Sequence, residues 1–462
     1  MSLTKTSDKN KTYLEKDSQF VNQVLARCAP IVAHKASGSY VYDMNDEAYL
    51  DFTTGIAVTN TGHCHPKVVK AIIDQASKLL HTSVTTYHKN YIDLAEKLVS
   101  VVPKGLDRVF LANSGAEAVE GAIKLARYVT GRPAIINFKG SFHGRTLLTT
   151  ALTTSKLYYR ENYEPLPGSI FTVPYPYVFG SQFKDSPQKC VDNVFEHLDT
   201  LFNQFVSPSQ VAAMIIEPIL GEGGYVVPPD GFLTRLRKFC TDHKILLIID
   251  EVQSGFGRSG KMFACQYDNI EPDIMLMAKG IASGMPLSAF VAKKEIADKW
   301  PQGRHGNTFG GNPVSCAAAL ATLEVIEEEK LLENCQKVGD FMLKKLREIL
   351  ILLIALGLST YGCVMNEEVK RINMVKNNNN KFKELVEGNL TGKQIFIRSC
   401  NTCHPGGKKS SVAPDIRDFK TIFKTPQELK EFIANGKNHM PAQNKLTSAE
   451  LNNIVEYMYK QF

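Results

Sequence analysis

Short runs of apolar residues alternate with stretches of helical periodicity through the middle of the 462-residue chain. The clearest runs are Arg108–Ala112, Ala134–Phe138, Ala212–Glu217 and Lys244–Asp250. The last of these has five consecutive apolar residues between polar ones, which is typical of a strand that is buried on both faces of a parallel sheet. The segment Ala118–Tyr128 has apolar residues at helical spacing. The alternation predicts an α/β domain around a largely parallel sheet between residues 105 and 300.

The pattern changes on either side of this region. Residues 1–30 are mostly polar and predict a tail that leads into a short helix. Residues 38–58 alternate as strands do around turns. Residues 314–348 predict a long helix, a short break and a second helix.

Residues 349–365 contain no charged side chain, and the first ten are almost all aliphatic. Lys344, Lys345 and Arg347 precede the run, and Cys363 follows small residues near its end. A basic patch, an apolar run and a small residue before a cysteine are typical of a lipoprotein signal peptide, although this one lies in mid-chain. A buried core helix is the alternative, and seventeen uncharged residues also reach the lower limit for a transmembrane helix. The flanking residues favour export.

The C-terminal part is separated by a polar stretch at 366–388, where four consecutive asparagines predict a linker. A small helical unit follows, with helical spacing in Pro426–Asn435 and Ser448–Lys460.

The formal net charge of +7 is unevenly distributed. Residues 366–462 hold 16 Lys and Arg against 10 Asp and Glu, which leaves a balance of only +1 for the first 365 residues. A nearly neutral first part gives no electrostatic basis for binding nucleic acid. The basic tail predicts a solvated surface or a docking face for an acidic partner.

The strongest chemical signal pairs Asp250 with Lys279. Asp250 ends an apolar strand, and ligands of open α/β sheets bind at the carboxyl ends of strands. A buried carboxylate needs a cation, and a protonated pyridine nitrogen would serve. A lysine that can bond to a carbonyl carbon completes the requirements for pyridoxal phosphate (PLP).

Two other motifs are weaker. Gly255–Gly260 matches the dinucleotide pattern G-x-G-x-x-G, but four residues separate it from the strand and no amphipathic helix follows. His63, Cys64 and His65 suggest a metal, yet adjacent residues cannot all reach one ion without strain. A structural loop is the preferred interpretation of residues 63–65, and no nicotinamide site is expected at Gly255–Gly260.

Several motifs in the same order resemble class III PLP-dependent aminotransferases, especially the 4-aminobutyrate type, over residues 15–347. Acetylornithine or ornithine aminotransferases are the nearest alternative. The resemblance implies the type I fold of PLP-dependent transferases, with small-domain residues 1–60, a PLP-binding domain at 61–305 and the start of a second small-domain part at 306–347. The motifs are Asn113-Ser-Gly-Ala-Glu117, Phe142-His-Gly-Arg-Thr146, Glu217-Pro-Ile-Leu-Gly-Glu-Gly-Gly224, Ile249-Asp-Glu-Val-Gln253, Ala278-Lys-Gly280 and Asn307-Thr-Phe-Gly-Gly-Asn312.

The resemblance also implies residue roles. Lys279 would hold PLP covalently and move the substrate proton, and Asp250 would keep the ring nitrogen protonated. The cofactor would further contact Ser114, Gly115, Ala116, Phe142, His143, Val252, Gln253 and, from the partner subunit of a homodimer, Thr308. The amino-acid and 2-oxo-acid substrates would be bound by Ile56, Arg145 and Glu222.

The sequence departs from the family after Arg347. The family continues for roughly a hundred residues more and supplies a second arginine, which binds the α-carboxylate of glutamate and pairs with the acid matching Glu222. Arg371, Arg398 and Arg417 lie in no comparable context. Glu222 is therefore expected to lack a partner, and the truncated small domain is expected to expose apolar surface.

Residues 389–462 resemble a class I-like cytochrome c. Cys400-Asn-Thr-Cys403-His404 is the motif for covalent haem c, in which His404 binds the iron. The resemblance makes Met440 the second axial ligand, with His439 as the alternative. The basic tail would then dock to an acidic redox partner.

The two resemblances imply different compartments. Seven scattered cysteines in the first 340 residues are typical of a reducing cytoplasm, whereas haem attachment takes place outside it. Either the segment 348–365 crosses the membrane and leaves the haem domain in the periplasm, or two genes have been joined, by natural fusion or by an assembly error. The truncated first part and the intact signal-like segment favour the second account.

Overall fold

The computed structural model describes residues 8–183, 186–349, 425–435 and 448–461. The chain divides into two compact units, Met1–Leu346 and Arg347–Phe462. Several predicted features lie outside the described residues: most of the apolar segment 348–365, the linker 366–388, and Cys400, Cys403, His404 and Met440.

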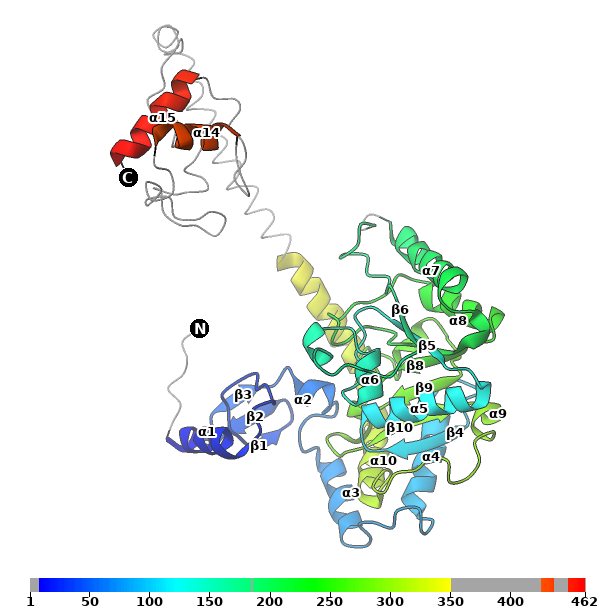
Figure 1. Ribbon diagram of the computed structural model, residues 1–462. Helices are drawn as coiled ribbons and strands as arrows, with labels where there is room; N and C mark the ends of the chain where they lie inside the picture. Colours follow the sequence, from blue (N-terminus) through cyan, green and yellow to red (C-terminus); the bar gives the residue numbers. More distant parts are fainter. Residues whose placement is uncertain (1–7, 184–185, 350–424, 436–447, 462) are drawn as a thin grey trace. The chain divides into compact units, whose positions relative to one another are not determined.

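A seven-stranded sheet forms the centre of the first unit (Figure 1). Its strand order is β4-β10-β9-β8-β7-β5-β6. Only β10 runs antiparallel to its neighbours, so the predicted α/β architecture with a largely parallel sheet is confirmed. The strands are β4 (Arg108–Ala112), β5 (Ala134–Phe138), β6 (Ile170–Val173), β7 (Val211–Ile216), β8 (Leu246–Asp250), β9 (Ile274–Met277) and β10 (Ser288–Ala292).

Helices cover both faces of the sheet, and the strand residues alternate between two hydrophobic cores. In β8, Leu247 and Ile249 belong to one core and Ile248 to the other. Burial on both sides explains why β8 is an unbroken apolar run. The first core includes residues of α4 (Lys89–Val101), α7 (Pro187–Gln204), α8 (Phe232–Asp242) and α10 (Pro313–Glu328), and the second includes α5 (Gly115–Thr130) and α6 (Leu147–Leu152).

Three neighbouring parallel strands deliver polar residues to one edge of the sheet. β8 lies between β7 and β9, with Asp250 opposite Leu276 of β9. Glu217 directly follows β7, Asp250 ends β8, and Lys279 lies two residues beyond β9. This edge is therefore where a ligand site is expected.

The N-terminal segment forms a small separate sheet, as the alternation at 38–58 predicted in part. Helix α1 (Asp8–Phe20) packs against it through a buried hydrogen bond of 2.8 Å from Asn10 Nδ2 to Asp43 Oδ2. The antiparallel strands are β1 (Ala33–Ser37), β2 (Tyr40–Asp43) and β3 (Ala48–Leu50), followed by α2 (Thr54–Ala57) and α3 (Pro66–Ala76).

The helix, break and helix predicted at 314–348 are present. Helix α10 ends at Glu328, and residues 331–349 are helical again. The second helix exposes a row of large apolar side chains, as expected for a truncated small domain. They include Val338, Phe341, Met342, Leu343 and Leu346.

In the second unit two helices are described, α14 (Pro426–Asn435) and α15 (Ser448–Gln461). Leu429 and Ile433 of α14 are buried, as are Ile454 and Val455 of α15. Both helices agree with the predicted spacing. Of the helices within the described ranges, none is long and apolar enough to cross a membrane.

Some boundaries differ from the predictions. β8 begins at Leu246 rather than at Lys244, because Lys244 turns the chain with a left-handed φ of 54°. Helix α5 begins at Gly115 rather than Ala118, because Ser114 caps its first turn. β6, β9 and β10 were not predicted. The remaining short elements are α9 (Lys294–Ala297), η1 (Leu157–Tyr159), η2 (Pro208–Gln210), η3 (Ala264–Tyr267) and η4 (Lys279–Ala282).

Candidate active site

A cavity of about 340 Å³ opens at the carboxyl edge of β7, β8 and β9. Most of the predicted cofactor residues line it, although they come from distant parts of the chain. The lining residues are Val58, Asn113, Ser114, Gly115, Ala116, Phe142, His143, Gly144, Glu217, Asp250, Val252, Gln253, Ala278, Lys279, Gly284, Met285, Pro286 and Leu287.

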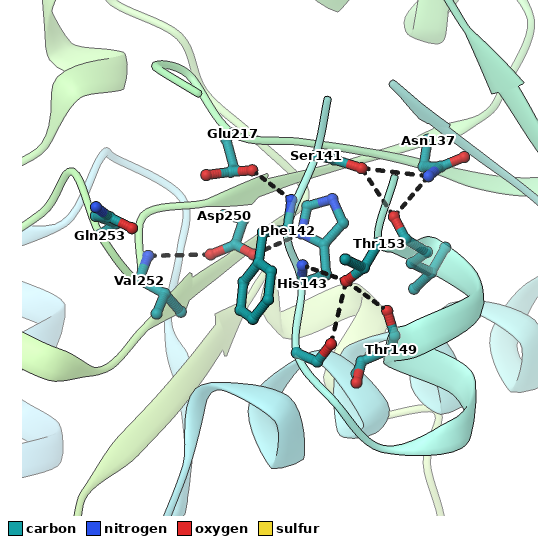
Figure 2. Close-up of polar contacts among 12 residues, drawn as sticks. Asn137, Ser141, Phe142, His143, Thr149, Thr153, Glu217, Asp250, Val252 and Gln253 are labelled. Carbon is teal, nitrogen blue, oxygen red and sulfur yellow. Dashed lines mark hydrogen bonds and ion pairs between the residues drawn. The ribbon is translucent and has the colours of Figure 1, made fainter. Parts of the chain in front are cut away.

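Asp250 is buried at the end of β8 and has a defined orientation. Its Oδ2 lies 2.7 Å from His143 Nδ1, and its Oδ1 accepts a hydrogen bond of 3.0 Å from the Val252 amide (Figure 2). His143 is itself fixed, since Thr153 Oγ1 accepts from its backbone amide at 3.0 Å. The carboxylate is thus held rigidly where it borders the cavity.

Glu217 places a second buried carboxyl group beside Asp250. It accepts hydrogen bonds from the amides of Phe142 (2.8 Å) and Gly221 (3.0 Å), the first of which is drawn in Figure 2. Burial raises the pKa of Glu217 to about 7, and the nearby charge of Asp250 acts in the same direction. Glu217 is therefore largely neutral below neutral pH.

We expect this buried carboxyl group to make stability depend on pH. Between its ordinary pKa of 4.5 and about 7, the folded PLP-free protein binds more protons than the unfolded chain, so stability falls as pH rises. From pH 5 to pH 8 the free energy of unfolding of the wild type should fall by about 2 kcal/mol more than that of Glu217→Gln. Denaturant unfolding can be followed by the fluorescence of Trp300, the single tryptophan. The exposed Glu96→Gln is the control, and a pH-independent difference for Glu217→Gln would refute the expectation.

Lys279 places its amine in the cavity. Its Nζ donates a hydrogen bond of 2.8 Å to Gln253 Oε1. Burial lowers the pKa of Lys279 below its usual value, which increases the fraction of neutral, nucleophilic amine. The backbone of Lys279 has a φ of 47°, a left-handed conformation that non-glycine residues rarely adopt.

The N-terminus of α5 forms another part of the cavity wall. Ser114 Oγ accepts from the Glu117 amide, and the Glu117 carboxylate accepts from the Ser114 amide at 3.1 Å, which makes a capping box. Within the described part of the chain, the amides of Gly115 and Ala116 have no hydrogen-bond partner. Such amides at the start of a sixteen-residue helix suit a phosphate group.

Three groups that border the cavity make it suitable for PLP. A buried carboxylate, a deprotonation-prone amine and free helix-terminal amides all border one space. The wall is also shaped closely, because a Cβ on Gly115 would lie 3.1 Å from Val252 Cγ1. Ser114–Ala116 could hold the phosphate, Asp250 the ring nitrogen and Lys279 the reactive carbon.

The predicted substrate residues lie outside this cavity. Arg145 stacks on the Tyr159 ring, with its guanidinium carbon 4.4 Å from the ring centroid. Ile56 is 71% exposed, although Val58 nearby does line the cavity. Thr308 is exposed and does not reach the cavity of its own chain.

The expectation that Glu222 lacks a partner is wrong. Its Oε1 accepts hydrogen bonds from Tyr159 Oη at 2.7 Å and from Lys156 Nζ at 2.5 Å. Partial burial acts to raise the pKa of Glu222, but these two hydrogen bonds outweigh it and leave the pKa below its usual value. A lysine in the loop after α6 therefore neutralises this acid.

The residues of the weaker motifs have structural partners. His63 Nε2 lies 2.7 Å from Asp51 Oδ2, and His65 Nε2 lies 2.9 Å from Glu329 Oε1. Among the described residues, no cluster of three or more His, Cys, Asp or Glu could hold a metal ion. Gly255–Gly260 forms consecutive turns after β8.

Residues 22–352 match the model of the protein family that is described as Aminotransferase class-III. The chain belongs to this family. The class III aminotransferase is 42% identical to an acetylornithine aminotransferase of Methanothermobacter thermautotrophicus over 73% of this chain and 80% of that protein. It is 41% identical to the 5-aminovalerate aminotransferase DavT of Pseudomonas aeruginosa over 74% and 79%. The ornithine aminotransferase of Toxoplasma gondii superposes with a TM-score of 0.66, at 31% identity, over 75% of this chain and 77% of that structure.

The aminotransferase carries a second domain. Residues 388–458 match the family described as Cytochrome C oxidase, cbb3-type, subunit III. The protein thus combines a PLP-dependent class III aminotransferase with a C-terminal cytochrome c domain, whose cofactor is haem c. Both predicted resemblances are confirmed.

Sequence reasoning assigned no role to Glu217, Lys156 or Tyr159. Glu217 had a usable signal, because it ends an apolar strand as Asp250 does. Lys156 and Tyr159 had none, since they lie at the two ends of the short helical turn η1, in a stretch whose course the residue pattern does not predict.

Proposed function

We propose that the aminotransferase transfers the amino group of an ω-amino acid, such as 4-aminobutyrate, to 2-oxoglutarate. The observation that carries the proposal is the position of the Lys279 amine in the cavity that the Asp250 carboxylate and the free amides of α5 also line. PLP, when bound, supplies an electron sink for the carbon that bears the substrate amine. Lys279 would hold the cofactor until the substrate amine takes its place, and its freed amine would then move the proton at that carbon.

The other cavity residues would orient the cofactor. Phe142 and Val252 would bracket its ring, and His143 would keep the Asp250 carboxylate aimed at the ring nitrogen. Gln253, which now accepts from Lys279, would reach the ring hydroxyl. Arg145 would bind the substrate carboxylate, because no acidic group among the described residues pairs with it.

Glutamate formation from 2-oxoglutarate tests this function in the full-length protein loaded with PLP. The amino donors to compare are 4-aminobutyrate, 5-aminovalerate, N-acetylornithine and ornithine. The proposal expects the highest kcat/KM with a donor that lacks an α-amino group. A higher value with N-acetylornithine or ornithine would favour the alternative suggested by the similarity to acetylornithine aminotransferase. If no donor yields glutamate, both the proposed function and this alternative are rejected.

An apolar surface supports the proposal of a homodimer. Val84, Tyr87, Ile92 and Phe309 form an exposed interface patch, in which Tyr87 is 96% exposed. The first three line a shared groove of about 400 Å³ with Gly310, and exposed Thr308 neighbours Phe309 in sequence. A large exposed aromatic patch is typical of a subunit contact. Thr308 would then reach the phosphate in the partner's cavity.

Replacing Tyr87 with glutamate should dissociate the dimer. A charge in an apolar contact weakens association, here by about 100-fold or more. Light scattering coupled to size exclusion measures the mass directly. Phe205→Glu is the matched control, because Phe205 is 70% exposed at the end of α7. A monomeric wild type, or an unchanged Tyr87→Glu dimer, would contradict the assignment.

For the cytochrome c domain we propose electron transfer through haem c. Cys400 and Cys403 would form the two thioether bonds, and His404 and Met440 would bind the iron, with His439 as the alternative. Haem that remains on the polypeptide after acid extraction would support covalent attachment. If acid extraction removes the haem, or if the protein contains no haem, covalent attachment is rejected.

The location of the two domains is a separate proposal. The aminotransferase domain would work in the cytoplasm, and the haem domain would be periplasmic or membrane-attached if residues 349–365 act as a signal or an anchor. Peptides that span residues 330–370, found by mass spectrometry in the native organism, would establish one continuous polypeptide. Their absence beside peptides from both domains would favour two joined genes.

A further inference from the structure

The short element α2 winds in the left-handed sense. Its φ angles are 47° at Thr54, 63° at Gly55, 66° at Ile56 and 62° at Ala57. Glycine adopts this conformation freely, whereas in other L-residues the Cβ lies too close to the following carbonyl oxygen. Three such residues within one turn persist only where their surroundings hold them, and strained segments of this kind concentrate at functional sites. The turn is therefore a candidate for a functional role.

Asp51 holds this left-handed turn at its start. Its Oδ1 accepts hydrogen bonds from the backbone amides of Thr53 at 2.8 Å and Thr54 at 2.9 Å, and from Thr53 Oγ1 at 2.7 Å. Its Oδ2 lies 2.7 Å from His63 Nε2. Burial acts to raise the pKa of Asp51, but these hydrogen bonds outweigh it and lower the pKa to about 2. Asp51 is therefore ionised at neutral pH, and an ionised carboxylate is a strong acceptor for backbone amides.

The residues after the turn pack against the segment that carries the reactive amine. A Cβ on Gly280, the residue that follows Lys279, would collide with the side-chain amide of Asn60. Thr61 Oγ1 lies 2.8 Å from the hydroxyl oxygen of Ser283, which directly follows η4. The chain is thus fixed by Asp51 before the turn and by η4 after it.

Val58 is the residue through which this segment reaches the cavity. Its side chain lines the cavity together with Lys279. Its amide donates a hydrogen bond of 2.8 Å to the carbonyl oxygen of Thr54, so the turn itself fixes the backbone of Val58. Another backbone course at residues 54–57 would break this hydrogen bond and change the direction in which Val58 enters the wall.

The expected contacts of PLP leave Val58 for the substrate. Ser114–Ala116 suit the phosphate, Asp250 suits the ring nitrogen, and Lys279 suits the reactive carbon. Val58 lines the same cavity and belongs to none of these groups. Its apolar side chain suits the hydrocarbon chain of an amino donor, since burial of methylene groups against apolar atoms is favourable.

We propose that Asp51 is a positioning residue for the amino donor, because it holds the left-handed turn that keeps Val58 in the cavity wall. Val58 then contacts the hydrocarbon chain of the donor. The proposal rests on the transaminase function above and adds a determinant of donor binding. Loss of Asp51 should weaken donor binding without affecting the residues that hold PLP or move the proton.

Replacing Asp51 with alanine in the full-length, PLP-loaded protein removes the acceptor of three hydrogen bonds. We expect KM for 5-aminovalerate to rise about tenfold, while kcat stays within about threefold of the wild type. Pentanoate has the same carbon chain but no amine that could react, and its affinity in calorimetric titration should fall by a similar factor. Amide hydrogen exchange in peptides that cover residues 53–60, measured by mass spectrometry, should become faster.

Two glycine exchanges test whether the effect passes through the turn. Glycine adopts a φ of 62° freely, so adding Ala57→Gly to Asp51→Ala should return KM and the pentanoate affinity to within about threefold of the wild type. Gly55→Ala should raise KM by about threefold in the otherwise wild-type protein. Its added Cβ would meet no atom closer than Val58 Cβ at 3.9 Å, so it disfavours the backbone conformation without a clash.

Two further variants serve as controls. Asp51→Asn keeps an oxygen that can accept from the two amides, so its KM should stay within about threefold of the wild type. Asp74→Ala removes an exposed aspartate that pairs with Lys70 on α3, and should leave KM and the pentanoate affinity unchanged.

The proposal is wrong if Asp51→Ala speeds hydrogen exchange but leaves KM and the pentanoate affinity unchanged, because Asp51 then only stabilises the fold. It is also wrong if Ala57→Gly restores neither quantity. If Asp51→Ala does not fold, Gly55→Ala decides, and an unchanged KM in that variant overturns the proposal.

Failure of the proposed function is recognised separately. If the wild type forms no glutamate, yet Asp51→Ala loses pentanoate affinity and Ala57→Gly restores it, transamination is refuted and the positioning role stands. If the wild type forms glutamate and Asp51→Ala has the same KM and the same pentanoate affinity, transamination stands and the role of Asp51 is refuted.

Discussion

Replacing Lys279 with alanine is expected to abolish transamination, with a loss of at least about 10⁴-fold in kcat. Lys279 carries the only amino group among the described residues that line the cavity. Alanine therefore removes both the covalent attachment of PLP and the base that moves the substrate proton. Glutamate formation gives the rate, and mass spectrometry after borohydride reduction shows whether PLP is bonded to the peptide that contains residue 279.

The matched variant Lys104→Ala should retain both the rate and the covalent label, because this lysine is exposed and does not line the cavity. Persistent labelling of Lys279→Ala would assign the attachment to another lysine. Residual activity within tenfold of the wild type would rule out Lys279 as the proton-transfer group.

The second large effect is expected for Asp250→Asn, with a loss of about 10²- to 10³-fold in kcat. Asparagine keeps the size of the side chain and an oxygen that can accept from the Val252 amide. It removes the negative charge that would stabilise a protonated ring nitrogen in the buried site. The rate is measured at saturating PLP, so that weaker cofactor binding does not contribute.

Asp242→Asn is the control, because Asp242 is exposed at the end of α8 and pairs with Lys238. A loss of less than threefold for Asp250→Asn would show that the charge of residue 250 is not used. Equal losses in both variants would indicate a general effect on folding.

The centre of the site could be predicted because it follows general rules of α/β sheets. An apolar run predicted β8, and the position of ligands at strand ends predicted the importance of Asp250. Burial on both faces made the run conspicuous, as the alternation of Leu247, Ile248 and Ile249 between two cores shows. The motif around Lys279 predicted the reactive amine of the site.

Other features depend on contacts between distant residues and left no local signal. The antiparallel direction of β10 is set by its pairing with β4 and β9, since a strand has the same residue pattern in either direction. The contact of Lys156 with Glu222 joins residues 66 positions apart, through a loop without periodicity. For the haem ligands, sequence motifs remain the sole basis of the assignment.

At residue 279, catalysis and folding favour different amino acids: the reaction needs a lysine, whereas the left-handed backbone favours glycine. For an L-residue with a Cβ this conformation costs about 1–2 kcal/mol, and glycine adopts it freely. Selection for activity is then the force that retains a lysine at this position. In descendants of this protein that no longer need transamination, residue 279 should drift toward glycine or asparagine rather than alanine. The identity of this one residue would therefore record whether a given lineage still uses its enzyme.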